Sequence, residues 1–406
     1  MQPNNHFQRH RLILNMINHL GPVSRTSLIE LTGYRPATVG SIVGELLEKE
    51  LIVETGFRSS GQGRKRTMLE IHKSHICGIG ISFTAHRVCL VLSQFDGTIL
   101  QQQELPYGAE HPDALTEQIT AGLQTLLQQY QDRFFAGIGI CKPLVDPLRY
   151  RSMGSVYTGP RSTWFEKTLA PYLEQTFHLR TEIFSSVTLP AQAEHRFGAA
   201  RDVEDFIWVE LSNGVGTSIF SGGHAIGGAD GTAGELGHTV TEGGAGRMCY
   251  CGKPDCVETA AAWPALQQQL RGALESGVIS CLQQRADKPL TVQDVRWALD
   301  QNDRMCRHYV AQAAGHLGRA IANAINLLNP RLIVLYGFML ELGPCFLEEL
   351  ERSMRSNTVF TSENFEVRIS DTSEQIMPLG AIANILSSYL RTEDYRWVYS
   401  LDKTDR

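Results

Sequence analysis

A compact cluster of metal-ligand residues constrains the fold of this chain more than any other sequence feature. Cys249, Cys251 and Cys256 follow a C-x-C-x4-C pattern, and His238 lies ten intervening residues before the first of them. Three thiolates and one imidazole match the ligand set of a closed tetrahedral zinc site. Because four protein ligands leave no position for water, the pattern predicts a structural Zn2+ that fastens a glycine-rich loop. Unrelated free thiols are the alternative.

The other cysteines and the composition indicate where the protein works. Six cysteines are scattered singly, and the chain begins with a polar segment that no apolar signal-peptide stretch follows. This usage is typical of a reducing compartment. No run of 18 uninterrupted apolar residues occurs, which argues against a transmembrane helix and membrane insertion. We therefore expect a cytoplasmic protein.

The charge of the chain is divided unevenly. Residues 1–71 contain nine Lys and Arg and six acidic residues, a net charge of +3, whereas the other 28 basic and 37 acidic residues give −9. The overall charge of −6 therefore does not exclude a nucleic-acid partner. A small DNA-binding head on an acidic body would show this division, although a charge of +3 over 71 residues also arises by chance.

The first 71 residues predict three helices followed by a β-hairpin. Apolar residues recur with helical spacing over residues 10–20. Ser24 is placed to cap a second helix that ends near Gly33, with Leu28 and Leu31 facing inward. Pro36 suits the first turn of a third helix. The third helix carries one apolar stripe, formed by Val39, Ile42, Val43, Leu46 and Leu47.

The opposite face of the third helix predicts a surface that reads DNA. It carries small or basic residues, namely Arg35, Thr38, Gly40, Ser41 and Gly44. Such a face can enter a major groove and donate to phosphates and base edges. Each glycine costs roughly 0.8–1 kcal/mol relative to alanine in a helix, so the pair indicates close approach to a partner, with chance as the alternative. We predict operator contacts from Arg35, Thr38 and Ser41. The acidic residues of the helix come later, beginning with Glu45, and we expect them to lie away from this reading end.

The hairpin that follows predicts the wing of a winged helix-turn-helix. Two short apolar segments flank a Gly/Ser/Arg stretch in which Arg64, Lys65 and Arg66 follow the glycines. These side chains can reach phosphates or a narrow minor groove, whereas a solvated loop is the alternative for three isolated bases. Combined with the three helices, the basic run favours a DNA-binding wing.

Strands that alternate with helices predict an α/β body after the head. We expect a winged head over residues 1–72, a first lobe over 73–190 and a second lobe over 191–406, with the C-terminal helix able to return to the first lobe. Two such lobes would place a small-molecule site at their boundary. Glu235 and Glu258 flank the predicted metal ligands, and fixed carboxylates at that place can accept hydrogen bonds from sugar hydroxyls. Ordinary surface acids are the alternative.

Together these motifs resemble the ROK family of repressors and sugar kinases, and its repressor branch in particular. The resemblance covers nearly the whole chain through the winged head, the E-x-G-H and C-x-C-G-x-x-x-C-x-E motifs, the glycine-rich turn at residues 211–219 and the segment 326–330. It implies an actin-like ATPase fold for the body and zinc on the His/Cys cluster. It also implies sugar contacts from Glu235, His238 and Glu258, and self-association into a homodimer or tetramer that places two heads on a palindromic operator. Asp255 replaces a glycine that is customary in the metal motif.

Two departures from the family's kinases argue against catalysis. The kinases carry Asp-x-Gly-Gly-Thr for the nucleotide phosphates, and the matching stretch here begins at Ser82 and lacks the Asp and both glycines. Their Asn-Asp pair, whose Asp is the general base, becomes Ser185-Ser186. A serine hydroxyl does not accept a proton near neutral pH as a carboxylate does. The same change weakens the case for family-standard sugar binding.

The sequence therefore predicts a non-enzymatic transcriptional regulator. We expect a repressor of carbohydrate uptake or catabolism genes that a sugar or sugar phosphate controls. An active ROK sugar kinase with an accessory DNA-binding head is one alternative. A repressor gated by a partner protein instead of a sugar is another.

Overall fold

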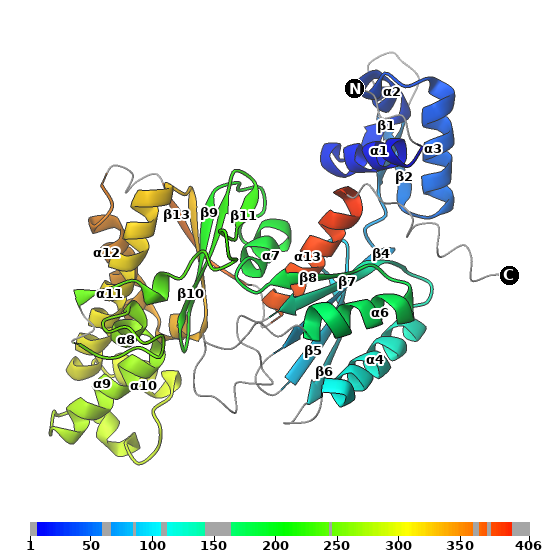
Figure 1. Cartoon of the computed structure of the whole chain (residues 1–406). Helices are drawn as coiled ribbons and strands as arrows, with labels where there is room; N and C mark the ends of the chain where they lie inside the picture. Colours follow the sequence, from blue (N-terminus) through cyan, green and yellow to red (C-terminus); the bar gives the residue numbers. More distant parts are fainter. Residues whose placement is uncertain are drawn as a thin grey trace. The chain divides into compact units, whose positions relative to one another are not determined.

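The computed structural model describes residues 6–58, 66–83, 87–106, 112–142, 164–242, 246–359, 365–371 and 375–391 of the chain. The described residues form two compact units (Figure 1). The first lies within Met1–Leu148, Arg161–Phe184 and Gln375–Arg406, and the second lies within Ser185–Glu374. No helix in these ranges is long and apolar enough to cross a membrane.

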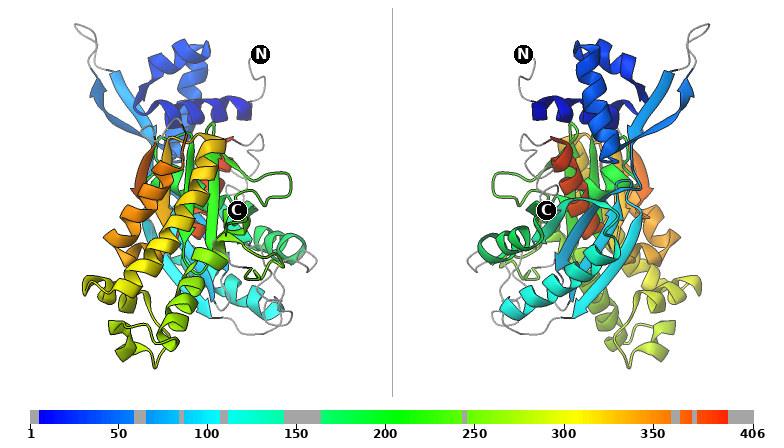
Figure 2. Two further views of the ribbon diagram at one scale, coloured as in Figure 1. Left: turned by 90° about the vertical axis from the view of Figure 1, so that its left-hand side faces the viewer. Right: turned by 90° about the vertical axis from the view of Figure 1, so that its right-hand side faces the viewer.

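The N-terminal part of the first unit confirms the expected three helices and hairpin. The helices are α1 (His6–Leu20), α2 (Arg25–Thr32) and α3 (Pro36–Glu48). The strands β1 (Val23–Ser24), β2 (Ile52–Arg58) and β3 (Arg66–Ile71) form an antiparallel sheet in the order β1-β3-β2. Figure 2 shows β2 and β3 projecting from the three helices as a hairpin.

Local sequence signals explain where these helices begin and end. The Ser24 hydroxyl accepts a hydrogen bond from the Ser27 amide at 3.1 Å and so caps α2. Gly33 ends that helix in the left-handed conformation, with a φ of 66°. Pro36 occupies the first turn of α3. The prediction that Leu28 and Leu31 face inward is confirmed for Leu28, which is fully buried, and wrong for Leu31, which is 60% exposed.

The first unit also holds a five-stranded sheet. Its strand order is β6-β5-β4-β7-β8. Strand β5 runs antiparallel to both of its neighbours, β4 and β6, whereas β7 runs parallel to β4. The strands are β4 (Ile76–Phe83), β5 (Arg87–Gln94), β6 (Ile99–Pro106), β7 (Phe134–Lys142) and β8 (Thr181–Ser185). Buried side chains of α4 (Pro112–Gln129), the π-helix η1 (Phe165–Leu169) and α6 (Ala170–Phe177) pack with strand residues such as Ile79 and Ile138 in one apolar core.

Helix α13 (Ile376–Arg391) packs against β4 and β7 at glycines. A Cβ atom on Gly80 would clash with the Pro378 carbonyl, and one on Gly139 would lie 2.6 Å from the Ala381 carbonyl oxygen. The absence of side chains on these strands therefore allows the helix backbone to approach the sheet closely. Residues near the end of the chain thus complete the core of the first unit.

The second unit repeats the strand order of the first. Its sheet runs β11-β10-β9-β12-β13, with β9, β10 and β11 antiparallel and β12 and β13 parallel to β9. The strands are β9 (Phe206–Leu211), β10 (Val215–Ser221), β11 (His224–Ile226), β12 (Leu332–Tyr336) and β13 (Glu366–Ile369). This repetition of one topology is the architectural basis of the two-lobed α/β body.

Helices cover the second sheet. One apolar core joins the sheet to α8 (Val257–Ala261), α9 (Trp263–Glu275), α10 (Val292–Asp300), α11 (Arg304–Leu328) and α12 (Pro344–Ser356). Helix α7 (Leu189–Phe197) packs on β9 and β10, where the His195 ring stacks on Phe220 at 4.3 Å. The short helices η2 (Leu236–His238), η4 (Cys281–Arg285) and η5 (Phe338–Leu342) lie in the connections.

Candidate functional site

The four predicted metal ligands converge in the second unit. His238 ends η2, Cys249 and Cys251 lie in the following turn, and Cys256 immediately precedes α8. The Cys249 Sγ atom lies 3.5 Å from His238 Nδ1, and the Cys251 and Cys256 Sγ atoms lie 3.5 Å apart. All four ligand atoms lie within 4.8 Å of one another, so the cluster could bind a metal ion.

We call the segment from His238 to Cys256 the metal loop; its residues 243–245 lie outside the described ranges. Backbone hydrogen bonds between residues that are close in sequence give the loop its shape. One example is the 2.8 Å bond from the Cys249 amide to the Lys253 carbonyl. Asp255 has a φ of 61°, which explains why glycine is customary at that position. The Asp255 carboxylate accepts a 2.7 Å hydrogen bond from the Gly246 amide, and this contact offsets part of the strain of the left-handed conformation.

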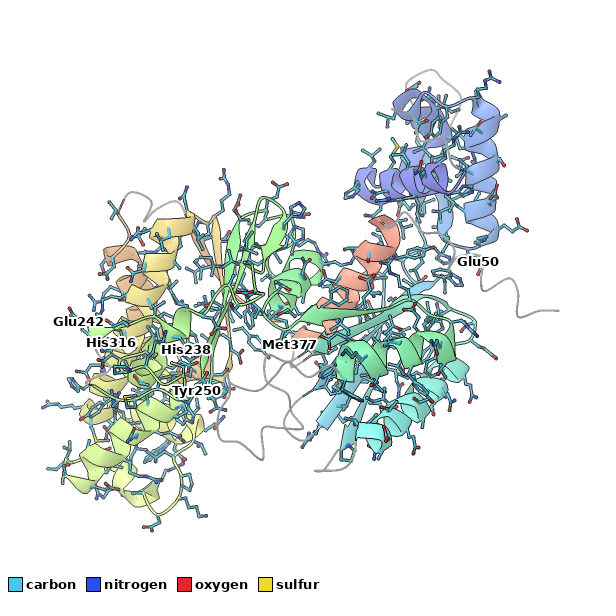
Figure 3. The ribbon with its side chains drawn as sticks, viewed as in Figure 1. Glu50, His238, Glu242, Tyr250, His316 and Met377 are labelled. Atoms are coloured by element: carbon cyan, nitrogen blue, oxygen red, sulfur yellow. The ribbon has the colours of Figure 1, made fainter. Side chains whose placement is uncertain are left out.

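The second ring nitrogen of His238 also has partners. Its Nε2 atom lies 3.1 Å from the Tyr250 hydroxyl oxygen and 3.7 Å from Glu235 Oε2. Figure 3 labels His238 and Tyr250, whose side chains lie next to each other in the second unit. A hydrogen bond on the nitrogen that faces away from a metal fixes the orientation of a histidine ligand. Sequence reasoning missed Tyr250, although its place between two cysteine ligands was a usable signal.

Glu258 is anchored on the sheet. Its Oε1 atom accepts a 2.8 Å hydrogen bond from the Val215 amide at the start of β10, and its Oε2 atom lies 4.0 Å from His238 Nδ1. The Glu258 side chain is only 12% exposed, whereas that of Glu235 is 35% exposed. The structure therefore brings together all three residues for which sugar contacts are predicted, Glu235, His238 and Glu258.

Two glycines allow this arrangement. A Cβ atom on Gly234, whose φ is 90°, would clash with the Thr217 carbonyl. A Cβ atom on Gly237 would lie 2.5 Å from the Val215 carbonyl oxygen and 2.9 Å from Glu258 Cγ. The segment that carries Glu235 and His238 thus lies directly against β10, which explains the spacing of the E-x-G-H motif.

The predicted DNA-reading face of α3 is accessible. Arg35, Gly40, Ser41 and Gly44 are exposed, and Thr38 is half-buried. Cβ atoms added to Gly40 and Gly44 would meet nothing within 4 Å. Packing inside the protein therefore does not require glycine at either position.

An acidic residue lies closer to this face than the sequence suggested. The Ser41 hydroxyl donates to Glu45 Oε1 at 3.2 Å, and Glu45 Oε2 lies 2.8 Å from His10 Nε2. Glu45 was expected to lie away from the reading end of the helix. Because α3 has 3.6 residues per turn, a residue four positions after Ser41 lies on the same face.

The structure describes one of the three basic residues of the wing. Arg66 is exposed at the first position of β3, where it pairs with Arg58 of β2. Arg64 and Lys65 lie outside the described residues.

Two positions match functional residues of the family's kinases, the phosphate-binding aspartate and the general base. The first lies on β4 and the second lies at the end of β8. Ser82 is buried near the end of β4, and residues 84–86 lie outside the described ranges. Ser185 ends β8 and Ser186 follows it, and both are half-buried. The Ser185 hydroxyl accepts a hydrogen bond from the Val187 amide at 3.4 Å, in the turn that leads to α7. Neither position carries a carboxylate.

Comparisons with known proteins agree with this architecture. A model of the ROK family matches residues 78–384. The N-acetylglucosamine repressor of Escherichia coli O6:H1 is 28% identical over 353 residues, which are 86% of this chain and 84% of that protein. The xylose repressor of Bacillus subtilis (strain 168) is 26% identical over 385 residues, 94% of this chain and 95% of that protein.

A solved structure extends the likeness to the fold. A ROK family transcriptional regulator, described as a homologue of the Escherichia coli MLC protein, has a TM-score of 0.78 and 22% sequence identity. The match covers 95% of this chain and 97% of that one. It therefore includes the N-terminal head as well as both α/β units.

Proposed function

Because the chain belongs to the ROK family, we propose that it is a DNA-binding transcriptional regulator that represses carbohydrate uptake or catabolism genes. One observation carries this proposal most directly: α3 presents an exposed face with two glycines that no internal contact requires. Relatives that match most of the chain are named as repressors for two different sugars, which supports the carbohydrate connection without choosing the sugar.

In this proposal α3 enters the major groove of an operator. Arg35, Thr38 and Ser41 contact phosphates or base edges, and Arg64, Lys65 and Arg66 of the wing reach the backbone or the minor groove. A homodimer or tetramer would place two heads on the half-sites of a palindrome. DNA binding of this kind weakens as salt rises, because each neutralised phosphate releases counterions.

We further propose that the body does not transfer phosphate. The kinase base is replaced by Ser186, and the phosphate-binding aspartate is replaced by Ser82. A hydroxyl cannot act as the general base that a carboxylate provides near neutral pH. ATP-dependent phosphorylation of a hexose or an N-acetylhexosamine by the purified protein would contradict this part of the proposal.

The His/Cys cluster fits a structural Zn2+. With zinc–sulfur bonds of about 2.3 Å, neighbouring sulfur atoms of a tetrahedral site lie ~3.8 Å apart, close to the 3.5 Å between Cys251 and Cys256. The ion would neutralise the thiolates and fix the loop, with His238 Nδ1 as the fourth ligand and Nε2 directed to Tyr250. Four protein ligands leave no position for substrate on the metal.

The effector is proposed to be a sugar or sugar phosphate that contacts Glu235, His238 and Glu258. Their proximity supports a shared hydrogen-bonding site, and carboxylates accept hydrogen bonds from hydroxyl groups. To act as a switch, the ligand must bind one conformation more tightly than another.

Genome-wide mapping of the binding sites, followed by operator-release assays, tests this function. We expect the sites to lie beside sugar uptake or catabolism genes, and the sugar of that pathway or its phosphate to release the operator. Failure to bind any chromosomal site would contradict the regulator assignment. Operator binding that ignores all sugars but responds to a cell protein would replace the sugar effector with a protein partner.

A further inference from the structure

Two consecutive hydrogen bonds connect the core of the N-terminal head to the face of α3 that is predicted to read DNA. His10 of α1 has a side chain only 7% exposed, and its Nε2 atom lies 2.8 Å from Glu45 Oε2. The Glu45 side chain is 32% exposed, and its Oε1 atom accepts a 3.2 Å hydrogen bond from the hydroxyl group of the exposed Ser41. A buried residue of one helix therefore orients an exposed serine of another helix through a carboxylate.

The carboxylate sets the direction of both hydrogen bonds. An ionised carboxylate only accepts hydrogen bonds, so His10 Nε2 carries a proton and the Ser41 hydroxyl is a donor. A hydroxyl group has one proton and two acceptor positions. Because that proton is directed to Glu45, the Ser41 oxygen can only accept a hydrogen bond from a partner outside the head.

The position of Glu45 suits a base edge better than the DNA backbone. Contacts with phosphates supply a large share of the affinity of DNA-binding proteins, and a carboxylate repels them. Glu45 lies one turn after Ser41, and Gly44 is a neighbour of both. A Cβ atom on Gly44 would meet nothing within 4 Å, so no side chain separates the two acceptor groups from a base on that side.

Among the bases of the major groove, cytosine matches two neighbouring acceptors best. Its N4 amino group is a donor, and cytosine presents no acceptor in that groove. Adenine presents the N6 donor beside the N7 acceptor, whereas guanine and thymine present acceptors only. Acidic side chains accordingly pair with the amino group of cytosine. A carboxylate and a serine oxygen that both accept therefore favour cytosine over the other three bases.

We propose that Ser41 and Glu45 form an acceptor pair that selects a cytosine in each operator half-site, and that His10 is the positioning residue of this pair. The inference rests on the proposed DNA-binding function and names the base that one part of α3 recognises. The basic side chains of the head supply affinity through phosphates, whereas the acceptor pair supplies selectivity. If the contact between His10 and Glu45 only held α1 against α3, its loss would not change the preference for a base.

Selection from a random pool of double-stranded DNA tests the base preference. The full-length protein and its variants are each used for selection, and the bound DNA is sequenced. We expect wild-type half-sites to contain a C·G pair whose replacement weakens binding about tenfold. Ser41→Ala should lose this preference, and Glu45→Gln should shift it toward adenine, because a glutamine amide pairs with adenine N6 and N7. Glu30→Gln, at an exposed glutamate of α2, should keep the wild-type preference.

Anisotropy titrations with the selected site and its single-base-pair variants test the role of His10. His10→Leu removes the donor and should reduce the preference for cytosine about tenfold, while sites without the cytosine bind as they bind the wild type. His10→Gln, whose amide can still donate to Glu45, should restore most of the preference. His19→Leu, at an exposed histidine of the same helix, is the control. Loss of binding to every sequence would indicate an unfolded head, and the Ser41 and Glu45 variants then decide the proposal.

The proposal is overturned if wild-type half-sites show no preferred cytosine, or if either Ser41→Ala or Glu45→Gln retains the preference. A folded His10→Leu variant with the full preference overturns the positioning role. If the wild-type protein enriches no sequence at all, the proposed regulator function fails as well. If it enriches a defined site that none of these substitutions alters, the regulator function stands and this inference fails.

Discussion

The Glu258 carboxylate accepts a hydrogen bond from the Val215 amide across 43 residues of sequence, with 2.8 Å between Oε1 and the nitrogen. This bond connects the helix that follows the last metal ligand to the first residue of β10. It holds one predicted sugar-binding group against the sheet while leaving Oε2 near His238. The same side chain thus serves the fold and the candidate effector site, and substitutions can separate the two roles.

We predict that Glu258→Ala destabilises the protein more than Glu258→Gln. Alanine leaves the Val215 amide without its acceptor, which costs about 1–3 kcal/mol for a buried donor, whereas the glutamine oxygen can still accept. Both variants should lose sugar-induced operator release, because neither retains the carboxylate. Thermal unfolding and operator-release titrations measure the two effects, with the exposed Glu242→Ala as the control. Equal melting temperatures for Glu258→Ala and Glu258→Gln would show that the hydrogen bond from the Val215 amide does not stabilise the fold.

Removal of one thiol ligand should abolish metal binding. We expect Cys251→Ser to reduce zinc from about one per chain to near zero, because a closed site needs all four ligands. If the lost metal lowers the free energy of unfolding of the second unit by only about 2 kcal/mol, the melting temperature of a domain of this size falls by about 4–8 °C. Elemental analysis and calorimetry of Cys251→Ser and of Cys345→Ser, a half-buried thiol outside the cluster, provide the comparison. Full zinc content in Cys251→Ser would refute the ligand assignment.

Local signals made the head and the metal loop predictable from sequence. Ser24, Gly33 and Pro36 each act within one or two turns of their own position, so their roles follow from neighbouring residues. Likewise, the metal ligands lie within 19 residues, and their chemistry selects few alternatives.

Contacts between distant segments were not predictable in the same way. The close approach of α13 to Gly80 and Gly139 joins residues that are hundreds of positions apart, and a strand glycine does not identify its partner. The bond between Glu258 and Val215 depends equally on how the sheet and the metal loop meet. The exposure of Leu31 reflects the limited width of the buried face on a helix of eight residues, which apolar spacing alone does not define.

The glycines of α3 provide a test that separates stability from DNA binding. Because added Cβ atoms meet nothing within 4 Å, Gly40→Ala and Gly44→Ala should each stabilise the head by roughly 0.8–1 kcal/mol through helix propensity. If the glycines allow close approach to the operator, the same variants should bind it more weakly. Denaturant unfolding and fluorescence anisotropy measure the two quantities. Stabilisation with unchanged operator affinity would remove these residues from the interface.

The wing prediction concerns the salt dependence of binding. Arg64→Ala combined with Arg66→Ala should weaken operator binding and lower the slope of log affinity against log salt by about one for each phosphate that the wing no longer neutralises. Arg304→Ala, an exposed arginine of the second unit, should change neither quantity. Anisotropy titrations at several salt concentrations measure the slope. An unchanged affinity and slope in the double variant would show that the wing does not bind DNA.

We expect a half-buried carboxyl group, that of Glu210, to make the stability of the second unit depend on pH. Burial raises the pKa of Glu210 in β9; a hydrogen bond from Ser212 opposes the shift and the nearby Glu258 charge adds to it. The fold therefore favours the neutral carboxyl, and this contribution is fully present below the ordinary pKa of glutamate and is lost as pH rises through the folded value. Glu210→Gln, which stays neutral, should raise the melting temperature at pH 8, and the gain should shrink as pH falls toward 4.5. Exposed Glu275→Gln should show no such trend, and a gain for Glu210→Gln that does not vary with pH would contradict the explanation by desolvation of this carboxyl group.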